Sequence, residues 1–144
     1  MDTSSRLFEF IVNHWALSAA FAGVIVLLVV TEIRRKLHGV PQLGPHAATQ
    51  AMNSEEALVL DVREDAEYKQ GHLANAVHIP LGQLSQRLKE LEQYRGRTVV
   101  AYCRTGNRSN SAASLLRRQG FTTVFNLAGG IVAWQNANLP VTKK

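Results

Sequence analysis

An apolar segment near the N-terminus decides how this chain can be divided. Between Phe10 and Thr31 the sequence contains no Asp, Glu, Lys or Arg, and residues 16–30 are almost entirely Ala, Val, Leu, Ile and Phe. A helix rises about 1.5 Å per residue, so about 20 such residues cross the apolar core of a bilayer, which is about 30 Å thick. The segment therefore predicts one transmembrane helix over residues 12–33, preceded by a short extracytoplasmic N-terminus at residues 1–11.

Two alternatives to a transmembrane helix are open from the segment itself. A cleaved signal peptide would start with basic residues and end at a small-residue cleavage site. This chain instead has Asp2, Arg6 and Glu9 before the segment and a charged exit at residues 32–36. The signal peptide is therefore the weaker interpretation. The other alternative, a buried helix of a soluble domain, depends on what the rest of the chain forms.

Basic residues that follow the segment predict its orientation. Arg34, Arg35 and Lys36 lie within one turn of the exit, whereas only Arg6 precedes the segment. Because Lys and Arg are enriched on the cytoplasmic side of membrane helices, we expect a single-pass protein of the inner (cell) membrane with a cytoplasmic C-terminal domain. The cytosol is reducing, which suits a chain whose one cysteine cannot form an internal disulfide.

Past the apolar segment, a basic juxtamembrane linker at residues 34–44 leads into a domain at residues 45–144. The linker contains Gly39, Pro41 and Gly44, which end the helix that leaves the membrane. Short apolar runs and stretches of helical period then alternate. The expected strands are 56–62, 76–79, 98–102 and 124–127, and the expected helices are 45–52, 65–70, 81–91, 109–119 and 130–136. This alternation predicts an α/β sandwich with a mainly parallel sheet.

Cys103 ends one expected strand and opens a short polar loop before the next helix. A lone cysteine is more often an inert core residue. Here, however, backbone N–H groups of a tight loop, a helix N-terminus, Arg104 and Arg108 would all stabilise a thiolate and lower the pKa of the thiol. Ligand sites in parallel sheets collect at the carboxyl ends of the strands, where Asp61 also lies. We therefore expect a reactive cysteine that acts on anionic sulfur or phosphorus compounds.

The run Val99–Ser109 resembles the active-site loop of rhodanese-type sulfurtransferases. Further pieces match in the same order along the chain, and together they cover residues 42–141: Leu60–Glu64, Glu67–Ala76, His78–Pro80, Asn126–Ile131, Trp134 and Leu139–Pro140. The resemblance implies a rhodanese-like three-layer sandwich. Such a domain has no place in its core for the apolar N-terminal helix, which disfavours the buried-helix alternative.

The resemblance also implies a sulfurtransferase that uses Cys103 as its nucleophile. A donor such as thiosulfate would leave a sulfane sulfur on Cys103 as a persulfide, and a thiol or cyanide would accept it. The residues expected to bind substrate are Arg104, Thr105, Gly106, Asn107, Arg108 and Ser109. Arg108 matches the family position more closely than Arg104, and Ser109 is either a helix N-cap or a ligand contact.

Residues outside the loop are expected to support it or to pack. Asp61 and Arg63 are the expected supporting pair, whereas His72, His78 and Trp134 are expected to be structural. Neither a metal nor a cofactor is predicted, because no group of His, Cys, Asp and Glu has ligand spacing. The formal charge of +5 includes the juxtamembrane cluster and shows no aromatic-interleaved basic patch, so nucleic-acid binding is not expected. The sequence names no protein partner.

Two further functions compete with sulfur transfer. Phosphatases and arsenate reductases of this fold have five residues between Cys and Arg, whereas only four, Arg104–Asn107, separate Cys103 from Arg108. The shorter loop suits a sulfur atom better than a tetrahedral oxyanion. The other candidate is a membrane-anchored docking or scaffold protein, but family members that lose activity usually lose the cysteine, which this chain keeps.

Overall fold

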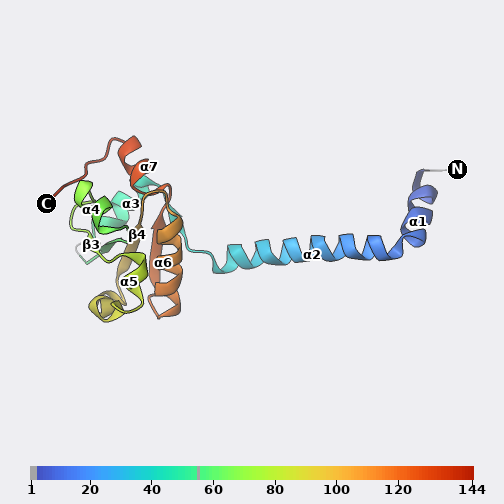
Figure 1. Cartoon of the computed structure of the whole chain (residues 1–144), viewed down its shortest axis with the longest axis horizontal. Coiled ribbons are helices and arrows are strands. Elements are labelled where there is room, and N and C mark those ends of the chain that lie inside the picture. Colours follow the sequence, from blue (N-terminus) through green and yellow to red (C-terminus); the bar gives the residue numbers. More distant parts are fainter. Residues whose placement is uncertain (1–2, 55) are drawn as a thin grey trace. The chain divides into compact units, whose positions relative to one another are not determined.

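The chain divides into two compact units, residues 1–39 and residues 40–144 (Figure 1). The computed structural model describes residues 3–54 and 56–144, and the side chains of residues 35–38 lie outside the described set. The N-terminal unit consists of helix α1, Thr3–Asn13, and helix α2, Trp15–His38. His14 separates them, because its φ of −121° and ψ of 42° are not helical.

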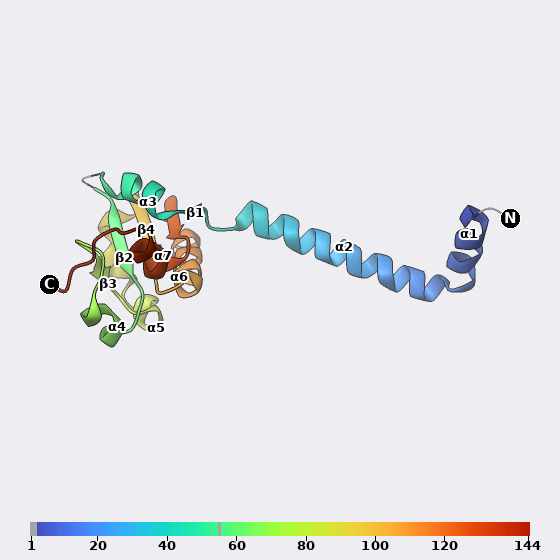
Figure 2. The ribbon, with the colours of Figure 1, turned by 90° about the horizontal axis from the view of Figure 1, so that it is seen from above.

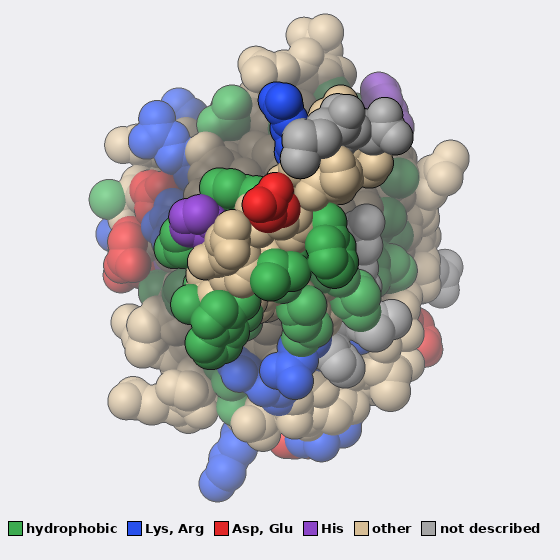
Figure 3. All heavy atoms as spheres, turned by 90° about the vertical axis from the view of Figure 1, so that its right-hand side faces the viewer, with side chains coloured by type: hydrophobic (Ala, Val, Ile, Leu, Met, Phe, Trp, Pro, Cys, Tyr) green, Lys and Arg blue, Asp and Glu red, His purple; other side chains and the backbone are tan. Residues whose placement is uncertain are grey.

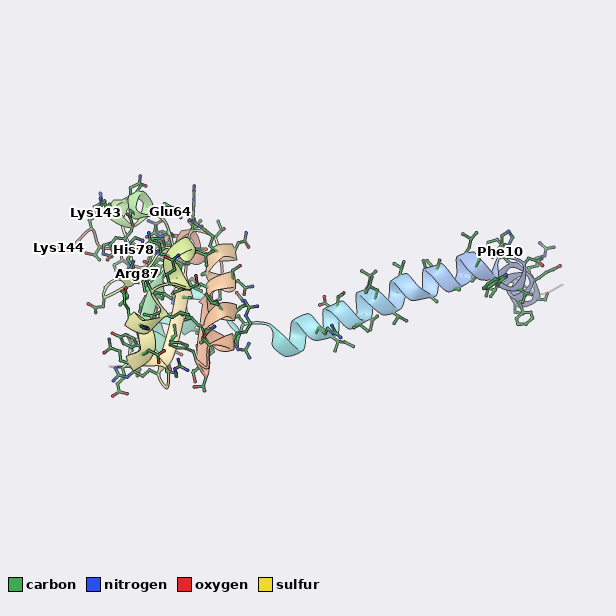
Figure 4. The ribbon with its side chains drawn as sticks, turned by 60° about the horizontal axis from the view of Figure 1, so that its bottom comes forward. Phe10, Glu64, His78, Arg87, Lys143 and Lys144 are labelled. Atoms are coloured by element: carbon green, nitrogen blue, oxygen red, sulfur yellow. The ribbon has the colours of Figure 1, made fainter. Side chains whose placement is uncertain are left out.

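The described part of helix α2 is mostly apolar, and none of its residues is buried. Within the described residues, Trp15–Arg34 is the one helical stretch long and apolar enough to cross a bilayer, and none of it is buried. A signal sequence near an N-terminus shares this length and composition. The stick view shows side chains projecting from α2 on opposite sides (Figure 4). In the space-filling view, hydrophobic side chains, in green, gather in the foreground (Figure 3). The stretch starts at Trp15 and not at the expected residue 12, because the break at His14 assigns Val12 to α1.

The C-terminal unit contains a five-stranded sheet in the order β1-β5-β4-β2-β3. All four strand pairings are parallel. The strands are β1, Gln42–Leu43; β2, Leu58–Asp61; β3, Val77–His78; β4, Thr98–Tyr102; and β5, Thr123–Leu127. The parallel α/β fold predicted from the alternation of elements is confirmed.

Helices cover both faces of this sheet and make three layers (Figures 1 and 2). One face packs against α5, Leu81–Leu84, the 3₁₀ helix η1, Leu88–Tyr94, and α6, Asn107–Arg118. The other face packs against α3, Pro45–Met52, and α7, Gly130–Asn136. Successive residues of β4 point to opposite faces, so both of its faces are apolar and buried. The short helix α4, Asp65–Gln70, follows β2.

Most expected elements are present, and three differ from the expectation. The expected helix 81–91 is wrong: α5 ends at Leu84 and a 3₁₀ helix follows. The two pieces still bury Leu84 and Leu91, and the tighter 3₁₀ turn stacks Leu88 above Leu91 on one side. The helix after the cysteine begins at Asn107, two residues before the expected start. Strand β1 was not expected at all.

Candidate functional site

The carboxyl ends of β2 and β4 bring the two predicted groups of site residues together. Asp61, the last residue of β2, pairs in register with Tyr102, the last residue of β4. Cys103 follows Tyr102 directly, so it lies beside Asp61 at one edge of the sheet. The chain then forms the cysteine loop, residues 103–106, which ends where α6 begins. Gly106 has a φ of 102°, a value that glycine adopts without steric cost.

The sulfur of Cys103 lies inside this loop and accepts hydrogen bonds. The backbone N–H of Gly106 donates to Sγ at 3.1 Å, and the hydroxyl of Ser109 lies 3.4 Å from Sγ. Cys103 is 1% exposed. Ser109 is the third residue of α6 and does not cap the helix, since Gly106 occupies the N-cap position. Its hydroxyl instead contacts the sulfur of Cys103, and the expected contact of Ser109 with a ligand stays a prediction.

The surroundings of Cys103 lower the pKa of its thiol. Burial is the largest single influence and opposes ionisation. The hydroxyl of Ser109 and the backbone N–H groups of Ser109, Gly106 and Thr105 outweigh it together, because each donates to the sulfur. A neutral pocket of backbone dipoles thus favours the thiolate, as the sequence predicts.

Helix α7 holds two carbonyl groups of the loop, and one of them, that of Arg104, shares its peptide group with the N–H of Thr105 that donates to the sulfur. The carbonyl of Cys103 accepts from the N–H of Ile131 at 2.9 Å, and that of Arg104 accepts from Val132 at 3.2 Å. Both donors belong to the first turn of α7. Gly130 allows the loop to lie this close to α7, because a Cβ at that position would overlap the main-chain carbonyls of Cys103 and Arg104. Helix α7 therefore sets the orientation of the loop.

The two arginines of the site differ in their partners. Arg108 donates to both carboxylate oxygens of Glu67, each at 2.8 Å. This pair lowers the pKa of Glu67 to about 2, and the Glu67 carboxylate raises the pKa of Arg108, with a further contribution from the Cys103 thiolate. Arg104 is exposed and has no hydrogen bond or ion pair to another described side chain. It is the loop's available positive charge, while Arg108 lies near the sulfur but is already paired.

Asp61 and Arg63 form a buried ion pair behind the loop. The guanidinium of Arg63 donates to Asp61 at 2.7 Å and also to the carbonyl of Gly71 at 2.7 Å. Tyr102 donates its hydroxyl to Asp61 at 2.6 Å, and burial followed by the Asp61 charge raises the pKa of Tyr102. Both carboxylate oxygens of Asp61 therefore take part in a hydrogen-bond network that joins β2, β4 and the end of α4.

The remaining predicted loop residues lie on its outer side. Thr105 and Asn107 have exposed side chains, and a groove of about 330 Å³ lies alongside the loop. The groove is lined by Arg63, Glu67, Gln70, Gly71, Arg104, Ile131, Val132 and Gln135. A larger hollow, about 630 Å³, lies at the opposite edge of the sheet, next to residues that precede β2 and β4, and is remote from the sulfur.

The histidines and Trp134 of this unit make structural contacts. His72 stacks on Tyr68 with ring centroids 3.8 Å apart, and its Nε2 lies 2.7 Å from the carbonyl of Lys144. His78 stacks on the same tyrosine, and Trp134 donates to the carbonyl of Pro140 at 2.9 Å. Across the described part of the chain, no three His, Cys, Asp or Glu side chains are grouped to hold a metal ion.

Sequence reasoning assigned no role to three residues that shape the site. Glu67 holds Arg108, Gly130 admits the loop carbonyls, and Asn126 bonds to Ser109 and Gly106. All three lie far from Cys103 along the chain. The consecutive glycines at 129 and 130 were the one local signal, because two positive φ values in a row mark a close backbone approach.

These features define a small parallel α/β domain that presents a cysteine in a loop of inward-facing N–H groups. The chain belongs to the rhodanese-like family, since the family model of the rhodanese-like domain matches residues 44–137. The resemblance found in the cysteine loop and its accompanying motifs is thereby confirmed.

Relatives of known sequence and structure agree with this assignment. The chain is 27% identical to the uncharacterized protein YibN of Escherichia coli (strain K12) over 96% of this chain and 97% of that protein. It is 39% identical to a protein named sulfurtransferase from Allochromatium vinosum, over 62% of this chain and 81% of that one. A rhodanese-related protein from Thermoplasma volcanium has a similar structure, with a TM-score of 0.65 and 31% identity over 72% of this chain and 99% of that one.

Proposed function

We propose that this chain is a membrane-anchored sulfurtransferase that carries a sulfane sulfur as a persulfide on Cys103. The observation that carries this proposal is the placement of Sγ among inward-facing N–H groups, which lowers the pKa of the thiol. The family of the chain and the A. vinosum relative named sulfurtransferase support a role in sulfur transfer. The loop stabilises an anionic sulfur without a general base, because the N–H dipoles do so directly.

The proposed reaction has two displacements on sulfur. The Cys103 thiolate attacks the outer sulfur of thiosulfate, a new S–S bond forms, and the S–S bond of the donor breaks with its electron pair leaving as sulfite. The Cys103 persulfide then bears the negative charge on its outer sulfur. A thiolate or cyanide attacks that sulfur, and the electron pair of the breaking bond returns to Cys103. No net oxidation of the protein occurs in the cycle.

Positive charge around the loop suits anionic donors. Arg104 is exposed beside the groove and has no described ion partner, so a guanidinium fork is available for an oxyanion there. Arg108 contributes its charge near the sulfur while Glu67 holds its position. The proposed donors are therefore small anions such as thiosulfate, and the groove of about 330 Å³ is the proposed route to the sulfur.

We further propose that α2 anchors the domain to the inner membrane, with residues 40–144 in the cytoplasm. Trp15–Arg34 is long and apolar enough to span the bilayer, and its large apolar side chains are exposed. The similarity to YibN covers 96% of the chain and so extends into the N-terminal unit. Arg34, Arg35 and Lys36 supply the basic residues on the cytoplasmic side. The side chains of Arg35 and Lys36 lie outside the described residues.

A fragment of residues 40–144 should fold alone and transfer sulfur from thiosulfate to cyanide or a thiol. The unit has its own core on both faces of the sheet and keeps all residues of the loop. The measurement is the rate of thiocyanate formation, compared with that of the full chain in detergent. A fragment with a cooperative thermal transition but no transfer from several donors would contradict the proposed enzyme and favour the docking role.

The proposed topology predicts that residues before α2 lie outside the cytoplasm. Ser4→Cys in a Cys103→Ser background should react with a membrane-impermeant thiol reagent on intact cells, because Ser4 precedes the span and is exposed. Lys143→Cys in the same background is the matched control and should react only after lysis. The reverse pattern of labelling would place the domain outside the cytoplasm, in an oxidising space where a free persulfide does not persist.

A further inference from the structure

A chain of hydrogen bonds, buried at Asn126 and exposed at Gln42, connects the site of Cys103 to the first strand of the domain. Asn126 of β5 is 2% exposed. Its amide nitrogen donates to the carbonyl of Gly106 at 3.0 Å and to Oε1 of Gln42 at 2.8 Å. Both amide hydrogens are used, so the orientation of the amide is fixed and its oxygen remains an acceptor. That oxygen faces the hydroxyl of Ser109.

The Ser109 hydroxyl has one proton and two neighbouring acceptors. Its Oγ lies 2.5 Å from Oδ1 of Asn126 and 3.4 Å from Sγ of Cys103. A hydroxyl donates one hydrogen bond at a time. The shorter contact holds the proton when the sulfur is neutral, whereas a negatively charged sulfur is the stronger acceptor. The amide oxygen and the sulfur therefore compete for one donor.

We propose that Asn126 is a positioning residue for Cys103, whose amide oxygen holds the Ser109 proton while the sulfur is neutral and yields it when the sulfur becomes anionic. Gln42 and Gly106 keep the amide in the orientation that this exchange requires. The proposal deepens the proposed function, since the persulfide is one such anion. Its test on the thiolate does not depend on sulfur transfer.

The same interactions tie the site to the segment where the domain begins. Gln42 donates to the carbonyl of Val40 at 2.9 Å, and the backbone N–H of Asn126 donates to the carbonyl of Pro41 at 3.0 Å. Val40 is the first residue of the C-terminal unit. Strand β1 thus does more than extend the sheet, because it holds the amide that faces Ser109.

The native charged groups near the sulfur are kept in every variant used below, and Asn126→Asp adds one carboxylate to them. The charged side chains around the site are Arg108 of α6, its partner Glu67 of α4, Arg104 of the loop, and the ion pair of Asp61 and Arg63 at the end of β2. None of them contacts Asn126 or is replaced. The Ser109→Ala shift in the pKa of Cys103 is taken within each background, where the other charges are the same, so it reports the competition for the Ser109 proton.

The test is a double-mutant cycle on the full chain in detergent. The pKa of Cys103 is measured from the pH dependence of its alkylation by iodoacetamide, which is unambiguous because the chain has one cysteine. Ser109→Ala should raise this pKa by about one unit in the otherwise native chain, because a hydrogen bond to the thiolate is lost. In an Asn126→Ala background the same change should raise it by about two units, because no acceptor competes with the sulfur there.

An equal or smaller Ser109→Ala shift in the Asn126→Ala background would overturn the proposal. Asn126→Asp gives an independent measurement if the alanine variant does not fold, because it keeps the size of the side chain and strengthens the acceptor, while it loses the hydrogen bonds that the amide donates to Gln42 and Gly106. In that background the Ser109→Ala shift should fall toward zero, and an undiminished shift would also overturn the proposal. Asn110→Ala is the control and should leave the pKa unchanged, since the Asn110 side chain bonds to the amide nitrogen of Gln42, whereas Asn126 bonds to its amide oxygen. If the native chain transfers no sulfur but the variants show the expected pKa pattern, the proposed function is contradicted and the proposed role of Asn126 is not.

Discussion

Replacing Cys103 by serine should reduce sulfur transfer to below a few per cent of the native rate, as expected for the loss of a nucleophile. A serine hydroxyl cannot accept a sulfane sulfur to form a persulfide. The fold should persist, because serine is similar in size and can bond to Gly106 and Ser109, the groups that now face the sulfur. We expect a loss of about 1 kcal/mol in the free energy of unfolding, the cost of burying a hydroxyl in place of a thiol.

The adduct on the protein checks this prediction directly. After incubation with thiosulfate and without reductant, the native chain should gain the mass of one sulfur atom, and the gain should map to Cys103. Cys103→Ser should gain nothing. Ser111→Ala on the exposed side of α6 is a matched control that should keep both the adduct and the rate. Transfer at the native rate by the serine variant would mean that another group carries the sulfur.

Local signals explain which elements the sequence predicts well. Helices α3, α4 and α7 have the expected bounds, and their start signals are local: Pro45 at the first turn of α3 and the capping box of Glu64 and Glu67 on α4. Strand β4 is an apolar run buried on both faces, which the sequence shows directly. The fold class follows from this alternation, because parallel strands need helical crossovers.

The elements that the sequence misses depend on distant partners. Strand β1 is two residues long and exists because Gln42 and Leu43 pair with β5. Leucines at positions 81, 84, 88 and 91 have helical spacing, but the sequence does not show that the chain tightens to a 3₁₀ helix after Leu84. A local pattern cannot report a strand or a tight turn that only tertiary contacts select.

The same division applies to the site. The cysteine, its glycine and the helix that follows are contiguous, so the loop is predictable from the sequence. The pairing of Arg108 with Glu67 is not, and it leaves Arg104 as the unpaired charge of the loop. Helix α7 orients the start of the loop through hydrogen bonds to the carbonyls of Cys103 and Arg104, and it lies far from them along the chain. The direction of a peptide group is therefore the property that the sequence gives least information about.

Gly130→Ala should damage both stability and sulfur transfer. Gly130 has a φ of 60°, which costs alanine about 1–2 kcal/mol. The added Cβ would also overlap the carbonyls of Cys103 and Arg104, an overpacking that costs about 1–3 kcal/mol. We expect the free energy of unfolding to fall by about 3 kcal/mol, measured by urea denaturation of the fragment 40–144.

The transfer rate of the same variant tests whether α7 orients the loop. If the carbonyls must move away from Gly130, the N–H of Thr105, which shares a peptide group with the Arg104 carbonyl, rotates away from the sulfur. The pKa of Cys103 should then rise and the rate should fall by about a hundredfold or more, the scale of losing one N–H donor to a reacting anion. Gly82→Ala is the matched control, because its Cβ would meet no atom within 4 Å and its position lies in helix α5. A Gly130→Ala protein that unfolds more easily but retains the native rate and thiol pKa would contradict the role of α7 in orienting the loop. Gly130 would then matter for stability only. The orientation of the loop would then depend on Gly106 and α6 alone.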